Sequence, residues 1–210
     1  HVNPNRVALL QSLVNNFHNV ELICSNPGAK LVTELWTKKK PSNKLSNQNS
    51  NQVIPKLPTI RSIKRKETIS LVSGYQLQLI PTPTARWPGG LMAFEENLGL
   101  LMSGKFFACH LCTSSWAETN RISTDEERRH YFDSLIAPMA SQVDGLIESL
   151  EELDIRSIAP GHGPAIEASW RSLFNDYRRW GECQKQSSMT MLLLFASAYG
   201  NTAAIADALA

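Results

Sequence analysis

Apolar residues recur with the 3.6-residue period of an α-helix in several parts of the chain. Between residues 6 and 17, for example, Val7 and Val14 fall on the same helical face. The Asn-Pro-Gly turn signal at 26–28 and the N-cap candidate Thr124 each indicate that a helix follows. The pattern predicts helices over residues 6–17, 29–36, 125–135, 139–153, 166–180 and 201–210.

Shorter apolar or alternating runs lie between these helices and have the character of β-strands. The run from Tyr75 to Ile80 alternates as a half-buried strand does. The longest apolar run, at 189–198, falls well short of the roughly 20 residues that a membrane span needs, and it suits a buried strand. Strands are expected over residues 20–24, 68–73, 75–80, 91–95, 99–103, 155–159 and 190–196.

The stretch from 38 to 66 follows neither pattern. It is rich in Asn, Ser, Gln and Lys and has few large apolar residues before Val53. Such a segment cannot bury enough apolar surface to offset the entropy lost on ordering. We expect an exposed, partly mobile insertion. Its positive charge suits a solvated loop, or docking to an acidic protein or a membrane surface.

Strands followed by helices predict an α+β fold built from layers of sheet and helix. The last strand, turn and helix have the pattern that opens a doubly wound α/β domain. We therefore expect one domain over 1–186 and the start of a second over 187–210. Because His1 has no strand before it and the final helix is unfinished, a fragment that lacks its N-terminal part is expected.

Composition narrows the class of protein. The 210 residues are 42% hydrophobic and 19% charged, as in ordinary soluble domains, and the net charge of +2 is too small to suggest a nucleic-acid binder. The start of the chain does not have the pattern of a signal peptide. Four cysteines do not form a disulfide framework in a chain this long, so the cytoplasm is expected. Cys109 and Cys112 form one CxxC, whereas a zinc ribbon needs two, so buried thiols are expected there.

Four stretches outside the predicted helices belong together. Their order and spacing resemble the metallo-β-lactamase-like domain of the flavodiiron proteins, also called A-type flavoproteins, over nearly all of 1–186. The resemblance implies an αββα sandwich that carries a di-iron centre, followed by a flavodoxin-like domain. The four stretches are HVNPNR at 1–6, PTARWPGG at 83–90, SGKFFACHLC at 103–112 and APGHGPA at 159–165.

The family holds its irons through residues that this chain has largely replaced. The resemblance implies that His1 and His162 are retained ligands. The changed positions are Asn3 in place of Glu, Asn5 in place of Asp, Arg86 in place of His and Lys105 in place of the bridging Asp. His18 and His130 are expected at the surface, and the role of His110, which closely follows the former Asp position, is left open.

These replacements predict that no metal binds. An amide is a weak ligand for iron, and Arg, which cannot be deprotonated, is none. Like unit charges about 4 Å apart repel by about 4 kcal/mol at an effective dielectric near 20. We expect a cationic pocket that holds water or a small anion such as chloride. In the alternative, Arg86 and Lys105 point to solvent or pair with nearby acids.

The stretch FASAYGNTAAIADAL at 195–209 is the second informative motif. Hydroxyl residues and a glycine at a helix N-terminus can cradle a phosphate, although the same residues suit an ordinary N-cap. The stretch resembles the FMN-phosphate loop of flavodoxins. That resemblance implies that the FMN phosphate is held by Ser197, Tyr199, Gly200, Asn201 and Thr202. The loops for the flavin ring would lie beyond 210, so this chain alone is not expected to retain FMN.

The resemblance implies an oxidoreductase of the diflavin type found in oxygenic phototrophs, in which members with altered iron ligands occur. Electrons would pass from NAD(P)H or another reduced carrier through FMN towards oxygen, forming water. We expect a homodimer, or a hetero-oligomer in which this chain supplies FMN to an iron-containing paralogue. Two other functions stay open: a zinc-dependent lactamase-like hydrolase, which lacks a clear third ligand beside His1 and His162, and a non-catalytic anion-binding module.

Overall fold

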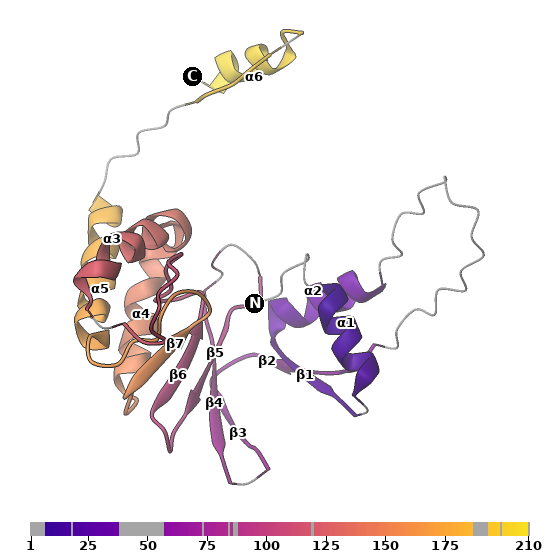
Figure 1. Ribbon diagram of the computed structural model, residues 1–210. Helices are drawn as coiled ribbons and strands as arrows, with labels where there is room; N and C mark the ends of the chain where they lie inside the picture. The colour runs from indigo at the N-terminus through magenta and orange to yellow at the C-terminus, as the bar shows by residue number, and fades with distance from the viewer. Residues whose placement is uncertain are drawn as a thin grey trace.

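The computed structural model describes residues 7–17, 19–37, 57–72, 74–83, 85, 88–118, 120–186, 193–197 and 199–209. Two β-sheets face each other, and helices cover their outer faces (Figure 1). The smaller sheet is a parallel pair, and the larger sheet has the order β3-β4-β5-β6-β7. The strands are β1 Glu21–Ser25, β2 Thr59–Ile63, β3 Glu67–Ser70, β4 Gln76–Pro81, β5 Leu91–Glu95, β6 Leu100–Gly104 and β7 Ser157–Pro160.

The helices fall into two groups on opposite sides of the sheets. One group lies beside β1 and β2, and the other lies beside β6 and β7 (Figure 1). The first group is α1 Val7–Asn16 and α2 Asn26–Thr37. The second group is α3 Ile122–Tyr131, α4 Ala140–Glu151 and α5 Trp170–Gln186, where a π-helical turn, Phe132–Ile136, and a 3-10 turn, Ala137–Met139, join α3 to α4. A further helix, α6, spans Asn201–Leu209.

Three apolar clusters hold the layers together. Ile63 on β2, Ile69 on β3 and Leu79 on β4 form the seam between the two sheets, with Ile23 of β1 packed against them. Val32 and Trp36 of α2 pack onto the outer face of the smaller sheet. The largest cluster lies between β4–β7 and the second helix group. These layers make the αββα sandwich that the sequence predicted.

Three helices begin elsewhere than predicted. α2 starts at Asn26, so Pro27 lies in its first turn, where a missing N–H costs no intrahelical bond. Thr124 lies inside α3, where its Oγ1 donates to the carbonyl of Arg121 (2.9 Å), and Asn120 Oδ1 accepts from Ile122 N–H (2.9 Å). α5 starts at residue 170 instead of 166, because 166 pairs its backbone with 158 in a β-bridge.

Two predictions on the strands were also wrong. Residues 59–63 belong to β2 and not to an exposed insertion: β2 runs parallel to β1, and Ile63 is fully buried. Of that predicted insertion, which ran from 38 to 66, residues 38–56 lie outside the described residues. Residues 193–196 form no strand, and Leu194 is 83% exposed. A strand needs a neighbour to bond its backbone, and none of the described strands pairs with this segment. Among the described helices, none is long and apolar enough to cross a bilayer.

Candidate functional site

The candidate site lies where β6 and β7 end. These strands are parallel neighbours, so the loops that follow them leave the same edge of the sheet. Lys105 is the first residue after β6, and His162 is the second after β7. The backbone ties the two loops together: Gly161 N–H donates to the carbonyl of Gly104 (2.7 Å), and Cys109 N–H donates to the carbonyl of His162 (3.3 Å).

The side chains of the two predicted site residues meet. Lys105 Nζ lies 3.4 Å from His162 Nε2, and both residues are half-buried. An ammonium group has donors only, so this contact needs a lone pair on Nε2. A metal ion bound at Nε2 would use that same lone pair. As they are placed, Lys105 and His162 therefore do not fit a metal ion.

The other expected ligand positions, His1, Asn3, Asn5 and Arg86, lie outside the described residues. Within the part that is described, no group of three or more His, Cys, Asp or Glu side chains could hold a metal.

His110 also lies at this edge. It packs edge-on against His162, with centroids 5.3 Å apart, and against Tyr131, at 4.9 Å. The structure places His110 beside His162 and assigns it no role, which the sequence also left open. His130 is exposed, as predicted, and His18 lies outside the described residues.

The CxxC residues differ in their surroundings. Cys109 is buried, and burial raises the pKa of its thiol. Cys112 is exposed, so the prediction of buried thiols was wrong for it: of residues 109–112, only Cys109 is buried. Gly163 (φ 84°) passes so close to Cys109 that an added Cβ would lie 2.5 Å from Cys109 Sγ. A glycine in the left-handed region is therefore required at this crossing.

The turn after Lys105 is held by buried polar side chains. Phe107 is fully buried and has a positive φ of 64°, which is uncommon for a residue other than glycine. Its N–H donates to the Tyr177 hydroxyl (2.8 Å), and its carbonyl accepts from Arg128. Arg128 also pairs with Glu118 (2.8 Å), and the two side chains are 1% and 4% exposed. Burial raises the pKa of Tyr177, so its hydroxyl stays neutral.

Sequence reasoning missed Glu118, Arg128 and Tyr177. Arg128 stands in the run DEERRH, which has the composition of a solvated helix face, and Glu118 lies in an irregular segment. No spacing rule relates these three positions, so no sequence signal could have brought them together.

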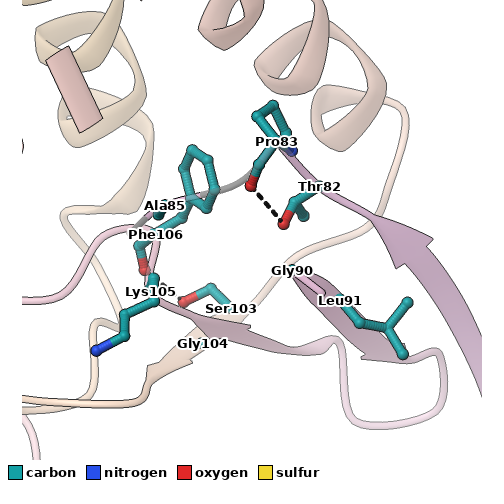
Figure 2. A pocket seen from close by; sticks show the side chains of 9 residues that line it. All are labelled: Thr82, Pro83, Ala85, Gly90, Leu91, Ser103, Gly104, Lys105 and Phe106. Atoms are coloured by element: carbon teal, nitrogen blue, oxygen red, sulfur yellow. Dashed lines mark hydrogen bonds between the residues drawn. The ribbon is translucent and has the colours of Figure 1, made fainter. Parts of the chain in front are cut away.

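A small cavity adjoins Lys105 on the side of the 83–90 stretch. It has a volume of about 10 Å³, close to the least that one water molecule needs. Figure 2 shows Lys105 at its edge, with the ammonium nitrogen turned away from Thr82 and Leu91. An added Cβ at Gly90 would lie 2.3 Å from Thr82 Oγ1, so Thr82, just after β4, and Gly90, just before β5, are packed tightly against each other. The cavity is too small for an organic substrate.

The predicted phosphate loop precedes α6. Gly200 has a φ of 82°, and its carbonyl accepts from Ala204 N–H (2.9 Å), so the helix begins directly after it. Tyr199, Asn201 and Thr202 are exposed, and Ser197 is half-buried. The first N–H groups of a helix have no intrahelical acceptor, and together with the helix dipole they suit a phosphate. The described residues of this loop therefore fit the phosphate end of FMN.

The chain matches known proteins over its whole length. Residues 1–163 match the family described as "ODP family beta lactamase". Diflavin flavoprotein A 4 of Synechocystis sp. is 37% identical over all of this chain, which covers 32% of that protein. Among solved structures, a metal-soaked Flv1 flavodiiron core from Synechocystis sp. is 32% identical with a TM-score of 0.77, over 100% of this chain and 48% of that one.

A second solved structure gives the same result. The fragment 1–254 of diflavin flavoprotein A 5 from Nostoc sp. is 28% identical with a TM-score of 0.74, over 89% of this chain and 67% of that one. The chain spans about a third of the length of these curated relatives, diflavin flavoproteins A 4 of Synechocystis sp. and of Nostoc sp.. Its fold is the metallo-β-lactamase-like fold of the flavodiiron cores. The chain belongs to the ODP family of beta lactamases and, within it, to the flavodiiron proteins.

Proposed function

We propose that this chain is part of a flavodiiron oxidoreductase in which a cationic pocket has replaced the di-iron centre. The observation that carries the proposal is the contact of Lys105 Nζ with His162 Nε2 at 3.4 Å. The position of the bridging carboxylate would now carry a cation, and a bond donated by its ammonium group would engage the Nε2 lone pair of a retained imidazole. The changes at Asn3, Asn5 and Arg86 remove three more ligands, which weakens metal binding further.

The whole protein would move electrons from NAD(P)H or another reduced carrier towards the reduction of oxygen to water. FMN would be held at its phosphate by Ser197, Tyr199, Gly200, Asn201 and Thr202, and its flavin ring supplies one- and two-electron chemistry. This chain contributes backbone N–H groups at the start of α6 and hydroxyl donors beside them. The names of the curated relatives, diflavin flavoproteins, support this assignment.

A protein of this family without iron needs another site for oxygen chemistry. We propose that this chain works in a hetero-oligomer with a paralogue that keeps the iron ligands, to which it supplies electrons from FMN; a homodimer is the alternative assembly. Several diflavin flavoproteins occur together in one organism: Nostoc sp. has those numbered A 4, A 5 and A 6.

None of the four cysteines, all of which are described, forms a disulfide, which supports a reducing compartment such as the cytoplasm.

The pocket itself is proposed to hold water or a small anion such as chloride. Lys105 carries a positive charge at the site, and Arg86 adds another in the matching stretch. Crystals grown with bromide in place of chloride would show an anomalous peak beside Lys105. Absence of that peak at saturating bromide would exclude a halide.

Metal analysis tests the proposal. Protein expressed with added iron should contain far less than one iron per chain, and near-stoichiometric iron would refute the proposal. Lys105→Ala exposes the Nε2 lone pair, so zinc titration should reveal weak binding in that variant and none in the unaltered chain. Lys185→Ala, which removes a surface lysine paired with Asp144 and Glu182, is the matched control. The same titration distinguishes this proposal from the alternative of a zinc-dependent hydrolase, because a zinc hydrolase requires tight zinc binding by the unaltered chain.

Co-expression with an iron-containing paralogue tests the partnership. The two chains should co-purify, and oxygen consumption by the mixture should exceed that of this protein alone. Full oxygen reduction by this protein alone, without iron, would contradict the partnership.

A further inference from the structure

The loop that places Lys105 at the site is anchored by polar side chains from two helices and from its own far end. We propose that Glu118, Arg128 and Tyr177 are positioning residues that set Lys105 against His162. None of the three touches Lys105 or His162 in the contacts described above, so each acts through the backbone. The functional importance of this positioning rests on the proposed function, whereas the positioning itself does not.

The Phe107 turn is the point at which the anchoring acts. Both polar groups of its peptide backbone are bound by side chains: the N–H by Tyr177 of α5, and the carbonyl by Arg128 of α3. The ring of Phe107 stacks on Phe174 (centroids 4.9 Å apart) and tilts against Tyr177 (4.7 Å). A buried residue with positive φ keeps that conformation only where its surroundings hold it. Lys105 lies two residues before this turn, so the direction in which it leaves β6 depends on the turn.

Glu118 extends the same anchor to the loop of His162. Its N–H donates to the carbonyl of Ala165 (2.9 Å), and its carboxylate accepts from Ser169 and from Arg128. Ala165 and Ser169 lie on the segment that leads from His162 into α5. One buried ion pair therefore binds the loop after β6 through Arg128 and the loop after β7 through Glu118.

The linkage has a consequence for the contact between the two site residues. Lys105 and His162 come from loops 57 positions apart in the chain, and their nitrogens are at the long end of hydrogen-bond distance. A small shift of either loop would end the contact. The Glu118–Arg128 pair and the Tyr177 hydroxyl fix both loops to the same helices and so fix their separation.

Tyr177→Phe is the cleanest test, because it removes one oxygen and keeps the ring contacts. The readout is the tautomer of His162 in the full chain, measured from the ¹⁵N shifts of its imidazole. In the unaltered protein Nε2 should be the bare, accepting nitrogen and Nδ1 should carry the proton. Tyr177→Phe should move both shifts towards those of Lys105→Ala, in which the contact is absent.

A second variant and a control keep the test decisive. Arg128→Lys retains the charge but lacks the planar guanidinium that donates to both Glu118 and the Phe107 carbonyl. It should therefore change the His162 ¹⁵N shifts in a similar way. Ile147→Val removes one methylene from the fully buried face of α4, and it should leave the His162 signals unchanged. If Tyr177→Phe and Arg128→Lys leave the tautomer as it is, or if Ile147→Val changes it equally, the positioning role is wrong.

Failure of the proposed function gives a different result. Stoichiometric iron in the unaltered protein would refute metal exclusion whatever the variants do to the tautomer. If Tyr177→Phe shifts the His162 signals and the variant still binds no zinc, the positioning role is upheld. Metal exclusion would then be due to the other replaced ligands and not to the contact between Lys105 and His162.

Discussion

Arg128→Met should be the most destabilising single change in this part of the fold. The substitution keeps a long apolar side chain in the same space and removes the guanidinium. Glu118, whose side chain is 4% exposed, would lose the bond from Arg128 at 2.8 Å. The carbonyl of Phe107 would lose its donor as well.

The size of the effect follows from the burial of the pair. At 2.8 Å and an effective dielectric near 20, the attraction between the two charges is about 6 kcal/mol. Several kcal/mol of lost hydration for each ion offset most of this, so the net contribution of the intact pair is modest. Removing one partner leaves the desolvation of the other uncompensated, which costs about 3–5 kcal/mol. For a domain of this size that corresponds to a melting temperature lower by about 6–20 °C.

Urea denaturation of four proteins measures the effect: the unaltered chain, Arg128→Met, Glu118→Gln and the double variant. Because the double variant carries no unpaired buried charge, it should be more stable than the sum of the single effects predicts, by about 2 kcal/mol. Arg129, the residue after Arg128, forms an exposed pair with Asp133. Arg129→Gln breaks this pair and should lower the free energy of unfolding by at most about 1 kcal/mol. An Arg128→Met cost no larger than that of Arg129→Gln would refute the reasoning.

Three further outcomes are expected. Gly163→Ala should destabilise the fold by more than about 1 kcal/mol, because the φ of residue 163 is positive and the new Cβ would meet Cys109. Gly145→Ala should stabilise the fold by about 0.5–1 kcal/mol, because Gly145 lies in α4 with open space around it. Urea midpoints that move in the same direction in both variants would contradict this. The bidentate bond from Arg178 lowers the pKa of the Glu151 carboxyl, so its stabilisation is present at neutral pH and lost as pH falls through the folded pKa. Glu151→Gln should therefore lower the free energy of unfolding by less than about 1 kcal/mol at neutral pH and leave it unchanged in acid. An equal loss at both pH values would oppose the assignment. Iodoacetamide should label exposed Cys112 before Cys109, whose pKa is raised by burial, and equal rates by peptide mass spectrometry would count against the buried thiol.

The strands of the larger sheet were predictable because the two faces of a strand differ in burial, as the alternation along β5 and β6 shows. β5 begins and ends at the predicted residues, and β4 and β6 are shifted by one residue. β2 was missed because only Ile60 and Ile63 mark it as apolar. Ile63 is buried in the seam between the two sheets, and no local pattern records that contact.

The structure brings together two of the expected ligand positions, and it supports them with residues that the sequence did not indicate. The order of the four stretches brought Lys105 and His162 to one edge of the sheet, because parallel strands end on the same side. The Glu118–Arg128 pair was not predictable, because charged residues in a helix usually face water and only the tertiary path of the 105–118 loop buries this one. The left-handed conformation of Phe107 also depends on side chains far along the chain.

The separation of Lys105 and His162 along the chain has a consequence for folding order. Helices α3 and α4 can form from local contacts, whereas β7 must close against β6 across the long connection that contains them. Pairing between distant segments is slower than local structure formation. The ammonium and the imidazole therefore meet late, and during biosynthesis a nascent chain passes through a stage in which the histidine is not yet capped by the lysine.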